Sequence, residues 1–317
     1  MRAATNDRYG PPDVARVTDV PKPRVRDGQV LVRVEATAVT SADARIRGAN
    51  FPAGFAVVSR LLFGIRRPRR RVLGSAFSGV VAEVGAKAEG HAVGDEVCGM
   101  VGFAMGAHAE YVAVAAKRAV RKPASVSHAD AAGVLFGGTT AVHFLRTVAQ
   151  VRPGATVLVV GASGAIGTNA VQLAEHMGAT VTAVTSTPNV ALVRDLGADH
   201  VIDYTATDLA SVAERFDVVL DTVGTFTPAT GRRLLTPDGV LVLVVASLGD
   251  NIRARGNVKA GVAAERPADF EYLVRLVADG DLRVVLDTVG GLDAIADAYK
   301  RVDSGHKVGN VVIRPNG

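Results

Sequence analysis

Apolar residues in the second half of the chain occur in short runs that alternate with segments of helical spacing. Residues 157–160 are four consecutive apolar residues followed by a glycine, a pattern typical of a parallel strand buried on both faces. Residues 168–177 then place apolar side chains at 170, 171, 173, 174 and 177, as an amphipathic helix does. The same rhythm predicts strands at 156–160, 180–185, 200–203, 216–221, 240–245 and 257–262. Such alternation indicates right-handed βαβ units and a doubly wound parallel sheet.

The first 120 residues follow a different pattern, in which apolar and polar residues alternate. Val30, Val32 and Val34 alternate within residues 29–36, as in a strand with one buried face. Similar segments at 79–85, at 110–114 and after a Gly94-Asp95 turn predict a small, mostly antiparallel, barrel-like domain.

Further elements connect and close the two regions. A helix-like segment at 128–146 is interrupted by Gly137-Gly138, which predicts a break in that helix. The remaining pattern predicts a helix at 267–279, a strand at 282–287, a helix at 292–303 and a strand at 308–313.

A glycine-rich turn joins the strand at 156–160 to the helix that follows it. In this turn Ala162 takes the place of the usual first glycine of a G-x-G-x-x-G pattern, and Gly161 precedes it. Gly164 would let the backbone approach a pyrophosphate, and Gly167 would let the helix pack close to the strand. The helix N-terminus offers unpaired N–H groups and the positive end of the helix dipole to phosphates. The flanking strand and helix therefore favour a dinucleotide site over an ordinary turn.

Composition narrows the class of protein. The chain has 317 residues, 48% of them hydrophobic, which suits two ordered α/β domains. Its one cysteine, Cys98, excludes a disulfide framework and a thiolate metal cluster, and we expect it to be a small buried apolar group. No apolar run reaches the roughly 18–20 residues of a membrane span, and no signal peptide is visible. We expect a soluble cytoplasmic protein without stable membrane insertion.

Several motifs in succession resemble one family. They are residues 158–167, 170–174, 196–204, 216–224, the N-terminal segment 9–12 and the closing segment 305–313. Together they resemble the zinc-independent quinone oxidoreductase branch of the medium-chain dehydrogenase/reductase superfamily, over nearly the whole chain. The resemblance implies an α/β protein with a GroES-like, mostly-β substrate domain, residues 1–122 and 263–317, and a Rossmann NADP-binding domain, residues 123–262. It also implies a homodimer joined through the edge strands of the Rossmann sheets, here residues 257–262.

Zinc-dependent members of that superfamily carry a Cys-His pair after an early strand and a Gly-His-Glu motif further on. Here the first place, residues 39–43, reads Val-Thr-Ser-Ala-Asp, and the second, residues 74–79, reads Gly-Ser-Ala-Phe-Ser-Gly. Hydroxyls and an alanine cannot supply the imidazole, thiolate and carboxylate ligands that a catalytic zinc needs. The four-cysteine structural lobe is missing too, so we expect no zinc.

The residue after the second strand of the parallel sheet bears on the choice of cofactor. In NAD-binding Rossmann domains an acidic residue there binds the ribose 2′-hydroxyl. Ser186 stands at that place, and the absence of a carboxylate favours NADPH over NADH. Ser186, Thr187 and Asn189 can donate hydrogen bonds to a 2′-phosphate. Pro188 replaces a lysine found in many relatives, and Arg194 lies further downstream, where a surface role fits equally well.

The resemblance implies further cofactor contacts along the cleft between the domains. Thr140 would approach the nicotinamide, and Tyr204 would border the 2′-phosphate, with a surface aromatic that caps its strand as the alternative for Tyr204. Asn310 stands where a lysine is common in the closing motif of the family. The expected cofactor contacts are Thr140, Gly161, Ala162, Ser163, Gly164, Ala165, Ile166, Ser186, Thr187, Asn189, Tyr204, Thr222, Val223, Gly224, Ala246, Ser247, Leu248 and Asn310.

The reaction that the resemblance implies is hydride transfer from NADPH to a small conjugated acceptor such as a quinone or an enone. The enolate or hydroquinone anion that results must be stabilised and protonated. Candidates are Thr40, Ser41 and Asp43, although Asp43 can equally cap a helix or pair with Arg45 or Arg47, and water can supply the proton. A zinc-free alcohol or ketone dehydrogenase and a non-catalytic NADPH-binding or sensing protein stay open as alternatives.

The segment from Phe51 to Arg71 is the least typical of the family. It is apolar at first, where Phe51, Phe55 and Phe63 are expected to contribute to the acceptor pocket, and it ends in Arg66-Arg67-Pro68-Arg69-Arg70-Arg71. The formal net charge of +5 depends on this arginine cluster. The cluster can be a solvated loop, can steer an anionic ligand, or can contact an anionic membrane that carries a lipophilic quinone. Without interleaved aromatic residues we do not expect nucleic-acid binding.

Overall fold

A computed structural model describes residues 1–316, and one of its sheets consists of six parallel strands in the order β10-β9-β8-β11-β12-β13. The strands are β8 (Thr156–Val160), β9 (Thr180–Thr185), β10 (His200–Asp203), β11 (Phe216–Asp221), β12 (Leu235–Leu243) and β13 (Val258–Ala260). The chain starts in the middle at β8, runs outward to β10, and returns to β11 on the other side of β8. The pair β8 and β11 is therefore the switch point of a doubly wound sheet.

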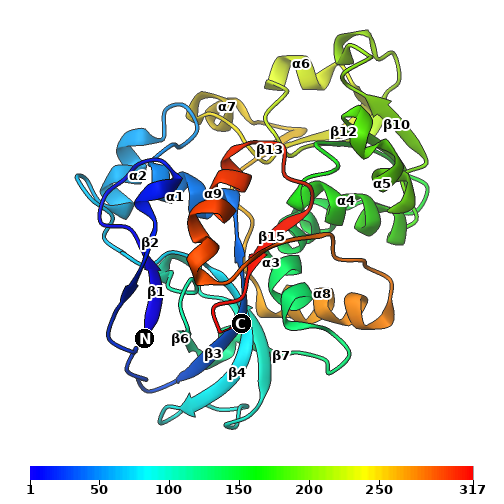
Figure 1. Cartoon of the computed structure of the whole chain (residues 1–317). Helices are drawn as coiled ribbons and strands as arrows, with labels where there is room; N and C mark the ends of the chain where they lie inside the picture. Colours follow the sequence, from blue (N-terminus) through cyan, green and yellow to red (C-terminus); the bar gives the residue numbers. More distant parts are fainter. Residues whose placement is uncertain (317) are drawn as a thin grey trace.

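Helices connect these strands. They are α4 (Ala165–His176), α5 (Val190–Asp195), α6 (Pro228–Arg232) and α7 (Leu248–Arg253). Because such crossovers are right-handed, the two halves of the sheet place their helices on opposite faces. Figure 1 shows α4 and α5 beside the green strands, with α6 and α7 above them.

A seven-stranded sheet joins the two ends of the chain. Its order is β14-β15-β3-β4-β5-β7, with β6 paired to β3, and only β14 and β15 are parallel to each other. The strands are β3 (Gln29–Val39), β4 (Ala76–Val84), β5 (Glu96–Met100), β6 (Tyr111–Ala115), β7 (Ala119–Arg121), β14 (Leu286–Gly290) and β15 (Asn310–Ile313). Figure 1 shows the red C-terminal strand β15 in the region of the blue strand β3. A separate hairpin pairs β1 (Arg2–Thr5) with β2 (Arg16–Asp19).

Five helices lie outside the parallel-sheet crossovers. They are α1 (Ser41–Gly48), α2 (Ala56–Phe63), α3 (His128–Val142), α8 (Pro267–Asp279) and α9 (Ile295–Asp303). A π-helical turn, His143–Val148, extends α3. None of the helices within residues 1–316 is both long and apolar enough to cross a bilayer.

Helix α3 joins the seven-stranded sheet to the helices of the other half. It contacts β3, β4, β5 and β15 of that sheet, and it contacts α4 and α8. Its glycines allow these neighbours to come close. A Cβ on Gly137 would lie 2.0 Å from the Ala165 carbonyl oxygen, and one on Gly138 would lie 2.8 Å from the side chain of Leu273. The largest apolar cluster of the protein accordingly includes residues of both sheets and of α3.

The predicted α/β fold class is confirmed. The strands expected at 156–160, 180–185, 200–203 and 216–221, and the helix at 267–279, have the predicted bounds. All four strands predicted after residue 221 have other bounds: β12 covers Leu235–Leu243 instead of 240–245, β13 covers Val258–Ala260 instead of 257–262, β14 covers Leu286–Gly290 instead of 282–287, and β15 covers Asn310–Ile313 instead of 308–313. The predicted break at Gly137-Gly138 is wrong, because these glycines lie inside α3 where its contacts with α4 and α8 require small residues.

We predict that Gly137→Ala destabilises the protein. The added methyl would overlap the Ala165 carbonyl, and relief of that overlap requires α3 and α4 to move apart. The free energy of unfolding should fall by about 1–3 kcal/mol or more, measured by denaturant titration. Gly48→Ala is the matched control, since the nearest atom to its Cβ is 3.7 Å away. Equal effects of the two substitutions would contradict the role of Gly137 in this packing.

Candidate cofactor site

Two glycines of the loop between β8 and α4 are required by the protein's own packing. Gly161 has φ +79°, a conformation that favours glycine, and a Cβ there would lie 2.6 Å from Val223 Cγ1. A Cβ on Gly167 would lie 2.2 Å from the Gly161 carbonyl oxygen and 2.6 Å from Ala162 Cα. Gly167 therefore lets the first turn of α4 rest directly on the end of β8, as the sequence analysis expected.

Gly164, the residue before α4, is different. Its φ of −79° and ψ of 177° are extended values that any residue adopts. A Cβ there would meet only the Gly161 carbonyl oxygen, at 3.4 Å, which is ordinary contact. Nothing within residues 1–316 explains why this position is a glycine. The open space in front of it faces the N-terminus of a twelve-residue helix, where backbone N–H groups and the helix dipole favour an anion. This arrangement fits a pyrophosphate.

The glycine loop is fixed by residues from distant parts of the chain. The Gly309 amide donates to the Ser163 carbonyl at 2.8 Å, and the Thr185 hydroxyl donates to Ser163 Oγ at 3.0 Å. Ser163, Gly164, Ala165 and Ile166 are half-buried, and Ala162 is fully buried. The loop is thus held between β9 and the segment that enters β15.

Lys307, which was not among the expected cofactor contacts, lies at this junction. Lys307 Nζ donates to the Gly309 carbonyl at 2.7 Å, and burial lowers the pKa of this ammonium to about 8. Asn310, which was expected to contact the cofactor, is 3% exposed, and its side-chain amide donates to the Val285 carbonyl. The signal for Lys307 was present, since it stands three residues before the place where the family commonly has a lysine.

The residues after β9 form a small polar group. Asn189 Nδ2 donates to Ser186 Oγ at 3.1 Å, so the Ser186 hydroxyl keeps its own hydrogen for another acceptor. The Thr187 hydroxyl donates instead to Asp203 Oδ2 at 2.6 Å. Hydrogen bonds from Thr187 and Thr205 lower the pKa of the Asp203 carboxyl. Ser186 and Asn189 therefore have donors available for a phosphate, whereas Thr187 is occupied.

The ends of the neighbouring strands lie along the same edge. Tyr204 follows β10, its side chain is half exposed, and its amide donates to the Thr185 carbonyl at the end of β9. Thr222 follows β11, and its hydroxyl donates to the Val160 carbonyl at 2.7 Å. These hydrogen bonds align the carboxyl ends of β8, β9, β10 and β11, which is where ligands bind in open α/β sheets.

Asp221, the last residue of β11, orders the loop that contains Val223 and Gly224. It is fully buried and accepts hydrogen bonds from the amides of Val223, Gly224 and Phe226. Burial raises the pKa of its carboxyl, and the hydrogen bonds from these amides oppose that shift. The side chain of Val223 is left 57% exposed beside Gly161.

The loop after β12 meets the other half of the protein. Ser247 caps α7 by accepting a hydrogen bond from the Asp250 amide, and Ala246 is buried. The Leu248 amide donates to the Ala53 carbonyl at 2.8 Å.

Thr140, the residue expected to approach the nicotinamide, lies in α3. Its side chain is 7% exposed, and its hydroxyl donates to the Phe136 carbonyl.

The three candidate residues for acceptor chemistry lie at the start of α1. Thr40 is its N-cap, accepts from the Asp43 amide at 3.1 Å, and donates its hydroxyl to Asp43 Oδ2 at 2.7 Å. Asp43 is fully buried, and its Oδ1 has no hydrogen-bond partner within residues 1–316. Ser41 is half-buried. The capping role that the sequence left open for Asp43 is thus present, with Thr40 as its partner.

Two further side chains that could carry acid–base or thiol chemistry, those of His108 and Cys98, are buried. His108 is fully buried, its Nε2 lies 3.1 Å from the Ala38 carbonyl, and its Nδ1 lies 3.3 Å from the Tyr299 hydroxyl. Cys98 is buried, and burial raises the pKa of its thiol to about 12. In the part of the chain that the structure describes, no three His, Cys, Asp or Glu side chains come together as a metal site would require.

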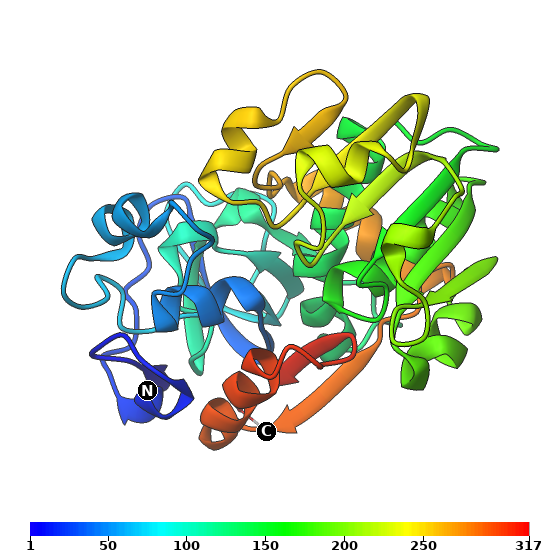
Figure 2. The same ribbon diagram turned by 90° about the horizontal axis from the view of Figure 1, so that it is seen from above.

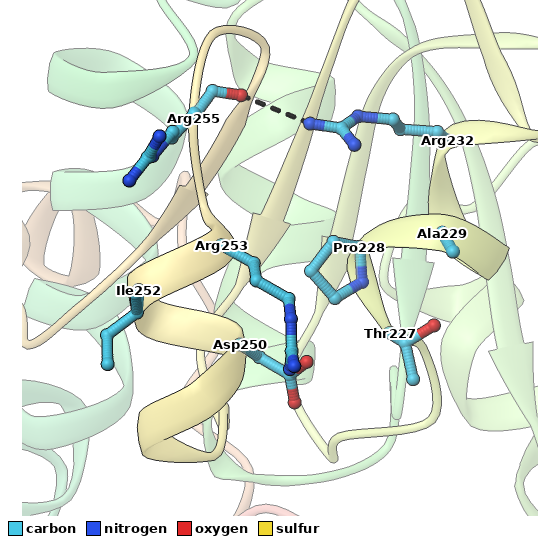
Figure 3. Close-up of a pocket in the computed structure, with 8 residues that line it drawn as sticks. All are labelled: Thr227, Pro228, Ala229, Arg232, Asp250, Ile252, Arg253 and Arg255. Atoms are coloured by element: carbon cyan, nitrogen blue, oxygen red, sulfur yellow. Dashed lines mark hydrogen bonds between the residues drawn. The ribbon is translucent and has the colours of Figure 1, made fainter.

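An open cavity of about 670 Å³ lies between α6 and α7. Figure 3 shows that Thr227, Pro228 and Ala229 line one side and that residues of α7 line the other. Arg232 reaches across the top of this view and donates to the Arg255 carbonyl at 3.2 Å. No residue that lines this cavity belongs to the expected cofactor contacts.

The chain is similar to known oxidoreductases over almost its whole length. The family "Alcohol dehydrogenase GroES-like domain" matches residues 26–124, "Alanine dehydrogenase/PNT, C-terminal domain" matches 125–241, and "Zinc-binding dehydrogenase" matches 196–313. The chain is 30% identical to the 2-methylene-furan-3-one reductase of Solanum lycopersicum, over 99% of this chain and 79% of that protein. It is 30% identical to a chloroplastic NADPH-dependent alkenal/one oxidoreductase of Arabidopsis thaliana, with 99% and 80% covered. The quinone oxidoreductase of Coxiella burnetii has a similar structure, with a TM-score of 0.88, 28% identity and 99% of both chains covered.

We predict that Gly164→Val leaves the fold intact but weakens NADPH binding. The backbone at this position tolerates a side chain, whereas the side chain would occupy the space in front of α4. The dissociation constant for NADPH, measured by calorimetry, should rise at least tenfold, which is about 1.4 kcal/mol. The melting temperature should change little. Gly167→Val should instead destabilise the fold, so similar melting temperatures of the two variants would contradict the assignment.

Proposed function

The chain belongs to the quinone oxidoreductase branch of the medium-chain dehydrogenase/reductase superfamily, and we propose that it transfers hydride from NADPH to a conjugated acceptor, a quinone or an enone. The observation that carries the proposal is Gly164, a glycine that the fold does not need, at the N-terminus of α4. The names of the relatives support the acceptor class, because they describe reductases of alkenals, enones and quinones.

The residues around the glycine loop fit NADPH. When bound, this cofactor supplies the hydride from its nicotinamide ring. The amides at the start of α4 and the nearby Lys307 would hold the pyrophosphate. Ser186 and Asn189 would donate hydrogen bonds to the 2′-phosphate. The remaining expected contacts, from Thr140, Thr222, Val223, Gly224, Ala246, Ser247 and Leu248, would line the cleft toward the nicotinamide.

At the acceptor end we propose distinct roles for the three residues that begin α1. Asp43 holds the Thr40 hydroxyl and so fixes the first turn of the helix. The Ser41 hydroxyl makes no hydrogen bond to residues 1–316 and would donate to the acceptor oxygen as negative charge develops there. Water would then supply the proton, since the Thr40 hydrogen is committed to Asp43.

Four further statements are part of the same proposal. The reaction needs no zinc, because residues 39–43 and 74–79 lack the usual ligands. The substrate domain comprises residues 1–122 and 263–317, and the cofactor domain comprises residues 123–262. Two copies associate through β13, which is an edge strand of the parallel sheet. The protein acts in the cytoplasm, in keeping with its single buried cysteine.

The test is a steady-state assay in two arms, each run before and after treatment with a metal chelator. One arm measures oxidation of NADPH by quinones, enones or unconjugated aldehydes, and the other measures reduction of NADP+ by unconjugated alcohols. We expect saturable turnover with quinones or enones that survives the chelator. Turnover restricted to unconjugated aldehydes with NADPH and alcohols with NADP+ would favour an alcohol dehydrogenase. Tight NADPH binding without turnover of any acceptor would favour a sensing or binding protein.

We predict that Ser186→Asp reverses the preference for the phosphorylated cofactor. A carboxylate at the end of β9 would repel the 2′-phosphate, whereas it could accept a hydrogen bond from the 2′-hydroxyl of NADH. The KM for NADPH should rise at least tenfold, equivalent to about 1.4 kcal/mol, and that for NADH should not rise. Ser125→Asp, in an exposed loop, is the matched control. An unchanged ratio of the two KM values would contradict the placement of the 2′-phosphate.

A further inference from the structure

Helix α2 carries an apolar face that the rest of the described chain leaves exposed. Val57, Val58, Leu61 and Leu62 are 71%, 57%, 57% and 52% exposed, and Ile65, just beyond the helix, is 64% exposed. Residues 57, 61 and 65 are four apart, and so are residues 58 and 62. This spacing places the five side chains on one face of the helix and its continuation. The only buried side chain of α2 is Ser59. The usual arrangement of an amphipathic helix in a folded protein is therefore reversed.

A cluster of arginines follows this stripe in the chain. No aspartate or glutamate occurs between Asp43 and Glu83, whereas five arginines follow α2 between residues 66 and 71, all of them exposed. Arg71 pairs with Asp7, itself highly exposed, at 2.5 Å. Arg66, Arg67, Arg69 and Arg70 form no ion pair within residues 1–316.

The helix is nevertheless firmly attached to the fold. The ring of Phe63 stacks on that of Phe51 at 5.7 Å and contacts Phe103 at 5.9 Å. The Tyr9 hydroxyl donates to the Gly64 carbonyl at 2.7 Å, and the Arg60 guanidinium lies over the Tyr9 ring. These contacts use the inner side of α2 and hold its apolar stripe outward.

The position of α2 leaves the stripe accessible. Figure 1 shows α2 on the left margin of the molecule, beyond α1 and away from the parallel sheet, and Figure 2 shows the same blue segment at the periphery from above. The segment just before α2 contacts the loop after β12, because the Ala53 carbonyl accepts a hydrogen bond from the Leu248 amide. A surface that docks through α2 would thus lie near a loop that we propose contacts the cofactor.

We propose that α2 and the arginines after it, residues 56–71, dock the protein on the surface of an anionic lipid bilayer. The interfacial region of such a bilayer accepts aliphatic side chains and attracts arginines at the same time. An acidic protein surface would neutralise the arginines but would not cover the aliphatic stripe. A second copy of the chain would bring like charges together across a symmetric contact. Docking is peripheral, since α2 has only eight residues.

The test is flotation of the full-length protein with vesicles of phosphatidylcholine alone and of equimolar phosphatidylcholine and phosphatidylserine, without cofactor or acceptor. We expect binding only to the vesicles that contain phosphatidylserine, and release by high salt. Equal binding to both kinds of vesicle, or to neither, would overturn the proposal. The result does not depend on the outcome of the reductase assay.

Two variants with matched controls identify the surface. Replacement of Arg66, Arg67, Arg69 and Arg70 by Gln should lower the partition coefficient at least tenfold, since each arginine near an anionic surface contributes about fivefold. Replacement of Arg152, Arg215, Arg233 and Arg275 by Gln removes the same charge from other exposed positions and should have a much smaller effect.

The double variant Leu61→Ser with Leu62→Ser should also weaken binding at least tenfold. The control Val93→Ser with Ile252→Ser, at positions that are also more than half exposed, should not.

The contrary outcomes are distinct. Equal losses in a variant and in its control would show that net charge or general hydrophobicity, and not this surface, determines binding. If the leucine variant instead changes the oligomeric state measured by sedimentation without lipid and leaves flotation unchanged, a second copy covers α2. Melting curves establish whether each variant is folded. If the leucine variant is unfolded, the arginine variant alone tests the proposal, because the four arginine side chains are exposed and their replacement should not disturb the fold.

Discussion

The hydrogen bond from the Gly309 amide to the Ser163 carbonyl, 2.8 Å long, connects the two halves of the protein at the place where we propose that the cofactor binds. Gly309 has φ +63°, and a Cβ there would lie 2.2 Å from the Val285 carbonyl oxygen. The backbone can therefore pass between β14 and the glycine loop only as glycine. Because this segment continues into β15, which pairs with β3, the position of the loop depends on both ends of the chain.

The glycines of the loop between β8 and α4 have two different roles. Gly161 and Gly167 are required by contacts inside the protein, and α3 approaches the same turn through Gly137. Within residues 1–316 Gly164 has no contact of this kind, and we propose that a bound pyrophosphate accounts for it. This separation is the physical basis for the assignment of a nucleotide site, since a turn that only reversed the chain would need no glycine at position 164. The proposed pyrophosphate site and the packing of α3 on α4 are thus built from the same few residues.

Much of the fold could be predicted from sequence, because strands buried on both faces appear as uninterrupted apolar runs, as at residues 156–160. The continuity of α3 through Gly137 could not, since it depends on contacts with α4 and α8. At the site, the Gly-rich turn and Ser186 were visible as residue types. Three other features could not be predicted, because they depend on segments that are distant in sequence. They are the hydrogen bond from Thr187 to Asp203, the burial of Asn310 and the position of Lys307 near the loop.

In the proposed reaction a hydride passes from NADPH to the conjugated carbon of an acceptor. The most direct measurement uses NADPH that carries deuterium at C4 of the nicotinamide, with an enone as acceptor. Both C4 stereoisomers are tested, and the one that transfers deuterium is used. NMR then locates the deuterium in the product. The account predicts a saturated ketone with deuterium on the β-carbon and a solvent-derived hydrogen on the α-carbon. Deuterium on the carbinol carbon of an alcohol, or no deuterium in the product from either stereoisomer, would contradict it.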